Sequence, residues 1–412
     1  MKQKLLVIGA GIGQIPIIEK AKKRGLYVIC VTIPGDWPAA ALADEMWYLD
    51  IYDREAIVER ARREGIDAVI SDQNDLMVPT VAYVAEKLGL PGNRFEQVWT
   101  FCNKNRFRAF CETCGVPVPK HTAIDDPGFD FASFDAPLPW IVKPADSQSS
   151  KGVQKIDLIE QARPALLAAL AQSKTRTAIL EQFFTGKEVP VEGYVADGVY
   201  YPLMIGDQLD FELNGLMIPA QRKYPSAAPA EVQQKIYDCE RKLAHALGVS
   251  FAITHSEYLY NEKGEICIIE SALRGGGVYI SSHLIPLATG IDVNDLLLRQ
   301  ALGEQVNVQA EMAKRKDAAS AYVCFCLKEG VIAKVEGMDE LKAMPFVKGV
   351  YLGGVKVGEI SHRVTEKGMR YGPILVAGKD REDLQKHIDD IEQTLHVFIE
   401  KDGAMQEGII WQ

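Results

Sequence analysis

The first hundred residues alternate short apolar runs with amphipathic helical stretches, and this alternation constrains the fold more than any other feature of the sequence. The apolar runs are LLVIGA, YVICVT, EMWYLD and DAVISD, and the helical stretches include DREAIVERARREG and LMVPTVAYVAEKLG. Strands that alternate with helices pair in parallel, because each helix carries the chain back to the same end of the sheet. We therefore expect residues 1–94 to form a doubly wound α/β domain.

The first strand runs into a glycine-rich turn, GAGIG, which raises the question of a bound dinucleotide. The dinucleotide fingerprint is G-x-G-x-x-G, followed by an acidic residue at the end of the next strand for the ribose hydroxyls. Gln14 stands where the third glycine belongs, and Asp36 comes four residues after the second strand ends at Thr32. The sequence meets neither requirement, so we expect that this turn does not bind NAD. This argues against an oxidoreductase.

Composition narrows the classes of partner. The chain has 412 residues, enough for two to four domains, and its net charge of −10 argues against a broad nucleic-acid surface. The basic start is interrupted by glycine and lacks a cleavage pattern, and no apolar stretch reaches membrane-spanning length. We expect a cytoplasmic protein that binds neither nucleic acid nor membrane; a homodimer is left open.

Two close cysteine pairs occur among the eight cysteines, Cys111 with Cys114 and Cys324 with Cys326. A zinc site needs a second close pair or histidines at ligand spacing nearby, and neither pair has them. We expect small buried side chains, with a redox role as the alternative.

The stretch HSEYLYNEKGEICIIESALRGG carries the strongest chemical signal. Glu257 and Glu270 lie on two runs joined by a tight turn, so an antiparallel hairpin can place both carboxylates on one face. Paired carboxylates repel unless a cation lies between them, and magnesium takes such ligands together with phosphate oxygens. Arg274, followed by Gly275 and Gly276, suits an anionic group such as a carboxylate. Two surface glutamates on a polar hairpin are the simpler alternative.

Two further segments suit a nucleotide. Lys143 ends a strand before the polar loop DSQSSKG, and such loops offer backbone N–H groups to phosphates. In ILEQFFTGKEV, Glu181 ends a strand and Glu188 can accept hydrogen bonds from a ribose. We expect the rings of Phe183 and Phe184 to belong to the core. Each segment alone could be an ordinary surface loop or strand end.

Taken in order, these motifs resemble the ATP-grasp superfamily, and the resemblance covers nearly the whole chain. It implies an α/β protein with the ATP-grasp fold, a Rossmann-like N-terminal domain that holds no dinucleotide, and a small C-terminal α/β unit. The implied divisions are an N-terminal domain, a central subdomain with a phosphate lid, a second subdomain with the metal and substrate site, and the C-terminal unit. Their residue ranges are 1–94, 95–180, 181–305 and 318–412.

The resemblance also implies roles for single residues. ATP is held between the two central subdomains with Mg²⁺, or Mn²⁺ in its place. For the nucleotide, the implied groups are the phosphate lysines Lys104 and Lys143; the lid residues Ser149, Ser150 and Gly152; Glu181 and the backbone near Phe183 and Phe184 at adenine; and Glu188 at the ribose. The implied metal ligands are Glu257 and Glu270, and the implied substrate contacts are Arg274, Gly275, Gly276 and His255. Arg274 and Lys143 are the implied catalytic residues.

One departure from the superfamily pattern refines the prediction. Many members read E-x-N-x-R, whereas this chain reads ESALR, with Ala272 in place of the asparagine. This form resembles the branch of L-amino acid ligases, and the segment DFELNGLMIPAQ and the C-terminal unit point the same way. One protein ligand to a second magnesium is therefore missing or replaced by water.

The expected activity is that of a carboxylate–amine ligase. ATP converts a carboxylate to an acyl phosphate, and an amine then displaces phosphate to form an amide, with amino acids as the expected substrates. The nearest alternative is an ATP-grasp enzyme that activates bicarbonate or a purine precursor. A nucleotide-binding protein without catalysis is a more distant alternative, and the complete set of Glu257, Glu270 and Arg274 argues against it.

Overall fold

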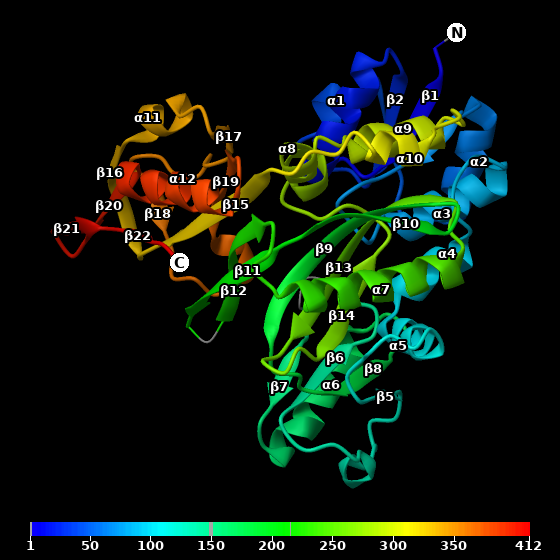
Figure 1. Cartoon of the computed structure of the whole chain (residues 1–412), viewed down its shortest axis with the longest axis horizontal. Helices are drawn as coiled ribbons and strands as arrows, with labels where there is room; N and C mark the ends of the chain where they lie inside the picture. Colours follow the sequence, from blue (N-terminus) through cyan, green and yellow to red (C-terminus); the bar gives the residue numbers. More distant parts are fainter. Residues whose placement is uncertain (1, 148–150, 215) are drawn as a thin grey trace. The chain divides into compact units, whose positions relative to one another are not determined.

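The computed structural model describes residues 2–147, 151–214 and 216–412 and divides into two compact units (Figure 1). Unit 1 comprises Met1–Pro202, Pro229–Gly277 and Val293–Val308, and unit 2 comprises Leu203–Ala228, Val278–Asp292 and Gln309–Gln412. Two stretches from the expected second subdomain, residues 203–228 and 278–292, thus group with the C-terminal residues. The finer four-part division stays a prediction.

Unit 1 begins with the expected parallel sheet. Its strands are β1 (Lys4–Ile8), β2 (Tyr27–Thr32), β3 (Glu45–Tyr48) and β4 (Ala68–Ile70), in the order β3-β2-β1-β4. Every neighbouring pair is parallel. Its helices are α1 (Ile15–Lys23), α2 (Arg54–Glu64), α3 (Val78–Leu88) and α9 (Val293–Ala301). Buried apolar residues join α1 and α9 to one face, and α2 and α3 to the other. The doubly wound prediction is confirmed.

Local chemistry explains where these helices begin and end. The side chain of Asp53 accepts a hydrogen bond from the Ala56 amide and so caps the first turn of α2. The same helix ends at Gly65, whose φ of 65° is a left-handed conformation that glycine adopts without steric cost.

A second, antiparallel sheet follows two short helices, α4 (Phe95–Cys102) and α5 (Lys104–Thr113). Its strands are β5 (His121–Ile124), β6 (Trp140–Pro144), β7 (Gln154–Ile156) and β8 (Ala178–Gln182), in the order β5-β8-β6-β7. Helix α6 (Ala162–Gln172) covers one face, where its Leu166 joins a buried cluster with Trp140 of β6.

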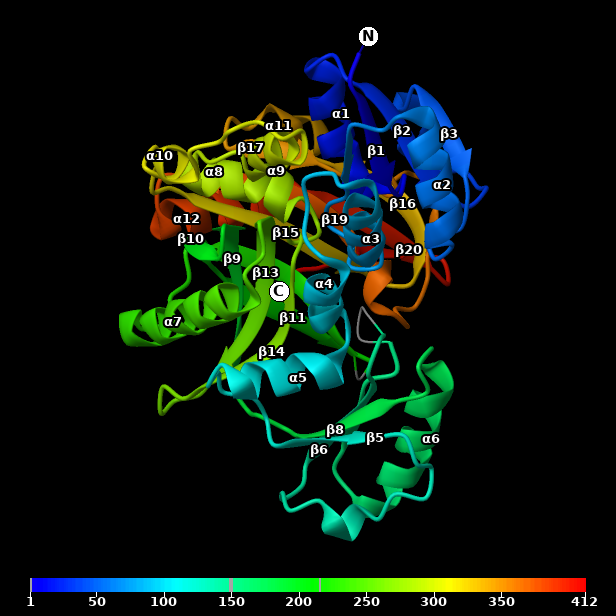
Figure 2. The same cartoon turned by 90° about the vertical axis from the view of Figure 1, so that its right-hand side faces the viewer.

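The third sheet of this unit carries the predicted hairpin. Its strands are β9 (Lys187–Ala196), β10 (Val199–Ile205), β13 (Phe251–Tyr260) and β14 (Ile266–Ala272), in the order β10-β9-β13-β14. Helix α7 (Ala230–Leu247) packs against one face, as Figure 2 shows beside β13 and β14. The opposite face carries the candidate site.

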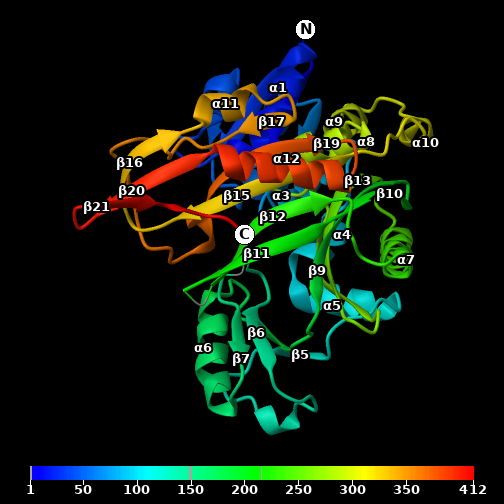
Figure 3. The same cartoon turned by 60° about the vertical axis from the view of Figure 1, so that its left-hand side comes forward.

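Unit 2 is built on one long strand, β15 (Ala319–Leu327), all of whose residues are buried. Its antiparallel sheet has the order β11-β12-β15-β19-β17, and a smaller sheet has the order β18-β16-β20-β21. The strands are β11 (Asp207–Leu213), β12 (Leu216–Tyr224), β16 (Gly330–Glu336), β17 (Val347–Val350), β18 (Ile360–Ser361), β19 (Tyr371–Gly378), β20 (His396–Lys401), β21 (Ala404–Glu407) and β22 (Ile409–Ile410); the helices are α8 (Ile285–Thr289), α10 (Val308–Met312), α11 (Met338–Ala343) and α12 (Arg381–Thr394). In Figure 3, α12 lies along β15 and β19, where Leu384 and Ile388 join the core.

The cysteines are buried or half-buried, and none forms a disulfide among the described residues. Burial raises the pKa of Cys324 and Cys326 on β15 to about 11, and that of Cys111 in α5 to about 12, which keeps these thiols protonated. This is the structural role expected for both pairs. No helix in the described part of the chain is both long and apolar enough to span a bilayer.

Candidate active site

The predicted carboxylates Glu257 and Glu270 lie directly opposite each other in the β13–β14 ladder. Residues directly opposite in an antiparallel pair project from the same face, so the two side chains are neighbours. Neither residue is fully buried, and the Glu257 side chain is 26% exposed. The two negative charges repel each other, so this pair favours a divalent cation that binds between them.

A cavity of about 240 Å³ opens over this pair and also contacts the β5–β8 sheet. Its wall includes three lysines, among them the predicted Lys104 and Lys143, together with both carboxylates. The remaining walls are formed by the following residues: Pro119, Ile141, Pro144, Ser147, Lys151, Val153, Glu181, Gln182, Phe183, Phe184, Glu188, Leu259 and Ile269. Positive and negative groups in one cavity suit a polyphosphate that carries a metal ion.

Lys143 is held in this cavity by a buried network of charges. Its Nζ lies 2.6 Å from Oε2 of Glu181, and Nε of Arg108 lies 2.6 Å from the other oxygen, Oε1. Burial alone would raise the pKa of Glu181, but the charges of Lys143 and Arg108 outweigh it and lower the pKa to about 2. Arg108 also donates to the carbonyl of Ile269 at 2.7 Å, which ties the two sheets together.

Lys104 is the first residue of α5, where the side chain of Asn103 caps the helix by accepting from the Arg106 amide. Its ammonium donates to the carbonyl of Ser147 at 2.6 Å, at the start of the predicted lid. Ser149 and Ser150 lie outside the described residues. Gly152 has a φ of 73°, and a Cβ there would meet the Gln172 side chain at 2.4 Å, so this position requires glycine.

Beside the metal pair, a second row crosses the same sheet. Glu192 on β9, His255 on β13 and Ala272 on β14 are in register. Nδ1 of His255 lies 2.7 Å from Glu192, and Nε2 lies 3.4 Å from Glu257. Burial lowers the pKa of His255, but the two carboxylates outweigh it and raise the pKa above its usual value. The imidazole thus holds the carboxylate of Glu257 from the side, within the same face of the sheet.

Arg274 follows β14 and is engaged by a carboxylate from the loop that follows β4. Its Nε and Nη2 donate to the two oxygens of Asp75 at 2.6 and 2.9 Å, and Nη1 donates to the carbonyl of Gly275. Burial would lower the pKa of Arg274, but Asp75 outweighs it and raises the pKa. The amide of Gly275 donates to Asp72, a second carboxylate of the same loop, at 2.9 Å.

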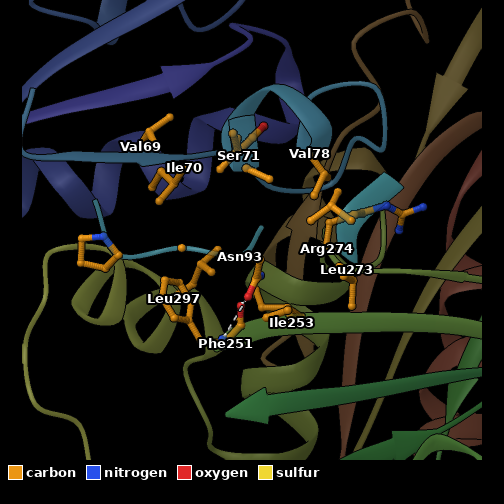
Figure 4. Close-up of a pocket in the computed structure, with 16 residues that line it drawn as sticks. Val69, Ile70, Ser71, Val78, Asn93, Phe251, Ile253, Leu273, Arg274 and Leu297 are labelled. Carbon is orange, nitrogen blue, oxygen red and sulfur yellow. Dashed lines mark hydrogen bonds between the residues drawn. The ribbon is translucent and has the colours of Figure 1, made fainter. Parts of the chain in front are cut away.

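A smaller cavity of about 50 Å³ lies between β4, α3 and β13 (Figure 4). Its lining is mostly apolar, with Val69, Ile253 and Leu273 among the residues drawn. Arg274 lies at its edge with the guanidinium directed away from it. A cavity this small and apolar, without a charged group pointing inward, does not suit an ionic substrate.

Three family models match successive parts of the chain. An ATP-grasp N-terminal domain matches residues 18–92, an ATP-grasp domain matches residues 136–282, and L-amino acid ligase C-terminal domain 2 matches residues 324–400. The middle match contains Lys143, Glu257, Glu270 and Arg274. The chain belongs to the ATP-grasp superfamily.

Individual relatives extend this assignment. The alanine–anticapsin ligase of Bacillus subtilis strain 168 is 29% identical over 59% of this chain, a region that spans 56% of that ligase. The formate-dependent phosphoribosylglycinamide formyltransferase of Methanocella arvoryzae is 21% identical over 98% of this chain and 94% of its own length. The L-amino acid ligase of Bacillus licheniformis has the same fold, with a TM-score of 0.81, 23% identity, and coverage of 97% of this chain and 99% of that one.

These findings confirm the predicted ATP-grasp fold and the predicted class, an ATP-dependent ligase with ATP and Mg²⁺ as cofactors. The cavity fits these groups, because the in-register carboxylates offer oxygen ligands and the lysines offer positive charge to phosphates. Among the described residues, no three His, Cys, Asp or Glu side chains are grouped to hold a metal by themselves.

The geometry of the site corrects one expectation and adds protein partners to two others, whose roles stay predictions. Phe183 and Phe184 are only partly buried and line the cavity, so their expected place in the core is wrong. The carboxylate of Glu181, expected at adenine, is engaged by Lys143 and Arg108. His255, expected at the substrate, is 6% exposed and lies between two carboxylates.

The glycine segment after Arg274 also differs from the expectation, in the partner of its backbone N–H group. Gly275 and Gly276 are buried, and the Gly275 N–H, expected to face a substrate anion, donates to Asp72. Lys104, Lys143, Glu188, Glu257 and Glu270 do line one cavity, as the prediction requires. Their individual roles stay proposals.

Three residues of the site were missed by reasoning from the sequence, namely Asp72, Asp75 and Arg108. Asp72 and Asp75 belong to SDQND, a polar cluster directly after the apolar strand β4. Polar residues at the carboxyl ends of parallel strands commonly form ligand sites, so this signal was available. Arg108 lies four residues after Lys104 on α5, the spacing that places two side chains on one helix face.

Proposed function

We propose that this protein is an ATP-dependent carboxylate–amine ligase that joins amino-acid substrates through an acyl phosphate. One observation carries the proposal: Glu257 and Glu270 are in register on one face, in the same cavity as Lys104 and Lys143. This set supplies a metal site and a phosphate site side by side. The matched L-amino acid ligase C-terminal domain supports amino acids as substrates.

In this proposal the nucleotide lies in the 240 Å³ cavity. Lys143, fixed by Glu181, and Lys104 bind phosphate oxygens, while Phe183, Phe184 and Glu188 line the part of the cavity assigned to the nucleoside. Glu257 and Glu270 hold magnesium, which neutralises charge on the phosphates when bound. The protein contributes position and charge, so no covalent intermediate with a side chain is needed.

Arg274 has donors left for the carboxylate substrate. A guanidinium carries five N–H groups, and the contacts to Asp75 and Gly275 use three of them. The two remaining N–H groups are assigned to the substrate carboxylate and, later, to the oxyanion of the tetrahedral intermediate. Asp75 keeps the planar guanidinium oriented while the remaining N–H groups bind the substrate. A lysine has no planar pair of donors, so we expect Arg274→Lys to lose this function.

The alternative is activation of a small carboxylate such as formate or bicarbonate. It is favoured by the near-complete coverage of the formate-dependent relative, at 98% of this chain and 94% of that protein. The matched L-amino acid ligase domain at residues 324–400 favours the amino-acid proposal instead.

The deciding experiment supplies ATP, Mg²⁺ and single carboxylates labelled with ¹⁸O, paired with a panel of amines. An acyl phosphate transfers one ¹⁸O from the carboxylate to the released phosphate, which mass spectrometry detects together with the amide product. We expect labelled phosphate with amino acids. Labelled phosphate with formate or bicarbonate alone would support the alternative, and no ADP release with any pair would contradict both.

A further inference from the structure

The glycine-rich turn that lacks a dinucleotide packs instead against the loop that follows β4, residues 71–77. A Cβ at Gly9 would lie 3.0 Å from Cε of Met77, and one at Gly13 would lie 3.1 Å from Cβ of Gln73. The hydroxyl of Ser71 donates to the carbonyl of Ile8 at 2.8 Å. The glycines therefore make room for this loop, hereafter the clamp loop.

Gln14, the residue that breaks the fingerprint, links the turn to the clamp loop. Its Oε1 accepts a hydrogen bond from the Gly11 amide at 3.0 Å, and its Nε2 donates to the carbonyl of Asp72 at 2.6 Å. The side chain is buried, at 2% exposure, so both bonds are shielded from water. The Gly11 N–H, which a bound dinucleotide would approach closely, is used inside the protein.

The clamp loop in turn holds the segment that contains Arg274. The carboxylate of Asp72 is fully buried and accepts from the Gly275 amide and from Nδ2 of Asn294, each at 2.9 Å. Asp75, three residues later, holds the guanidinium of Arg274 through two hydrogen bonds. Both contacts span about 200 residues of sequence, so they depend on the exact place of the loop.

We propose that Gln14 and Asp72 are positioning residues, through which the glycine-rich turn sets the place of Arg274 and Gly275 for the reaction. The inference rests on the proposed function for the role of Arg274, but its structural content is independent of it. If Gln14 fixes the clamp loop, then losing its Nε2 donor loosens Asp72 and exposes the Gly275 amide. ATP lies in a different cavity, whose lining includes neither residue.

The test compares Gln14→Gly, which restores the third glycine of the fingerprint, with Ile12→Gly as the matched control. Ile12 lies in the same turn and is 57% exposed, so this control adds the same backbone freedom without removing a buried bond. Gln14→Glu is a second variant of nearly identical shape that keeps Oε1 as an acceptor; it replaces the Nε2 donor with a second acceptor oxygen, which faces the Asp72 carbonyl and brings a negative charge when ionised. Hydrogen exchange at the Gly275 amide, ATP affinity and turnover are measured on all three.

We expect both Gln14 variants to exchange the Gly275 amide about tenfold faster than wild type, the effect of losing one buried hydrogen bond. Turnover should fall about tenfold, while ATP affinity stays within twofold and Ile12→Gly behaves as wild type. Unchanged exchange in the Gln14 variants, or equally fast exchange in Ile12→Gly, would overturn the inference. Because hydrogen exchange needs no reaction, wild-type protein without ligase activity would contradict the proposed function and leave this test intact.

Discussion

Strand β13 presents two faces that share one backbone but differ in chemistry. One face carries His255 and Glu257, of which Glu257 lines the cavity, and the face toward α7 carries Ser256 and Tyr258, both hydrogen-bonded to Glu240. The cavity face is partly exposed and gathers charge. The α7 face is buried, and its hydroxyl groups form hydrogen bonds within the protein. Oη of Tyr258, for example, donates to Glu240 at 2.7 Å.

The difference shows how burial decides what a carboxyl group does. On the α7 face, burial raises the pKa of Glu240 to about 7, so this carboxyl is readily neutral. On the cavity face, Glu257 and Glu270 are only partly buried and line the cavity. Substitutions on the cavity face should therefore change chemistry, and those on the α7 face should change stability.

The largest expected effect is on the cavity face. We predict that Glu270→Gln lowers Mg²⁺-dependent ADP formation a hundredfold or more, because one of two paired metal ligands is lost. The melting temperature of the Glu270→Gln variant without metal should equal or exceed that of wild type, because the repulsion between the carboxylates of Glu257 and Glu270 is removed. Enzyme assays and thermal melts check this, with the exposed Glu262→Gln as control. ADP formation by Glu270→Gln at a rate near that of wild type would contradict the proposal that Glu270 binds the metal ion.

The next effect concerns the cations of the same cavity. We predict that Lys143→Ala weakens ATP binding about ten- to a hundredfold, since a charged hydrogen bond to phosphate contributes about 1.5–3 kcal/mol. Calorimetry with ATP measures it, and the exposed Lys120→Ala serves as control. Equal ATP affinity in Lys143→Ala and wild type would contradict the phosphate role.

On the α7 face we predict a change in pH dependence. The pKa of Glu240 is about 7 in the folded protein and near 4.5 when unfolded, so the stability that it contributes is full below about 4.5 and is lost as pH rises through 7. Glu240→Gln should lack this loss and should gain stability relative to wild type between pH 5 and pH 8. Urea unfolding of wild type and Glu240→Gln at pH 5 and pH 8 measures the free energy of unfolding. If this free energy changed equally with pH in both proteins, the prediction would be refuted.

The smallest effect should come from the hydroxyl pair on the same face. The Oγ atoms of Ser256 and Ser271 lie 2.8 Å apart and are buried. We predict that Ser271→Ala lowers the free energy of unfolding by about 1 kcal/mol and leaves ADP formation unchanged. Chemical denaturation and the ADP assay measure the two quantities. A loss of activity like that of Glu270→Gln would break the contrast between the faces.

Local patterns in the sequence were enough to predict the parallel sheet and the in-register carboxylates. Alternating strands and helices fix parallel pairing, and a short turn fixes which residues of a hairpin face each other. The same reasoning could not assign Glu181, because its partners Lys143 and Arg108 come from two other elements, 38 and 73 residues away. Nor could it show that His255 is held by the carboxylate of Glu192, which lies 63 residues earlier.

The sequence by itself determined which groups are available: two acidic residues at hairpin spacing, lysines near strand ends, and a turn that lacks the glycine a dinucleotide needs. Only the tertiary structure decided which of these groups are used by the protein itself. Asp75 engages Arg274 from 199 residues away, and Gln14 fills the turn with its own side chain. The reason is physical, because hydrogen bonds and ion pairs depend on distances of about 3 Å, which the folded chain sets between residues that the sequence keeps far apart.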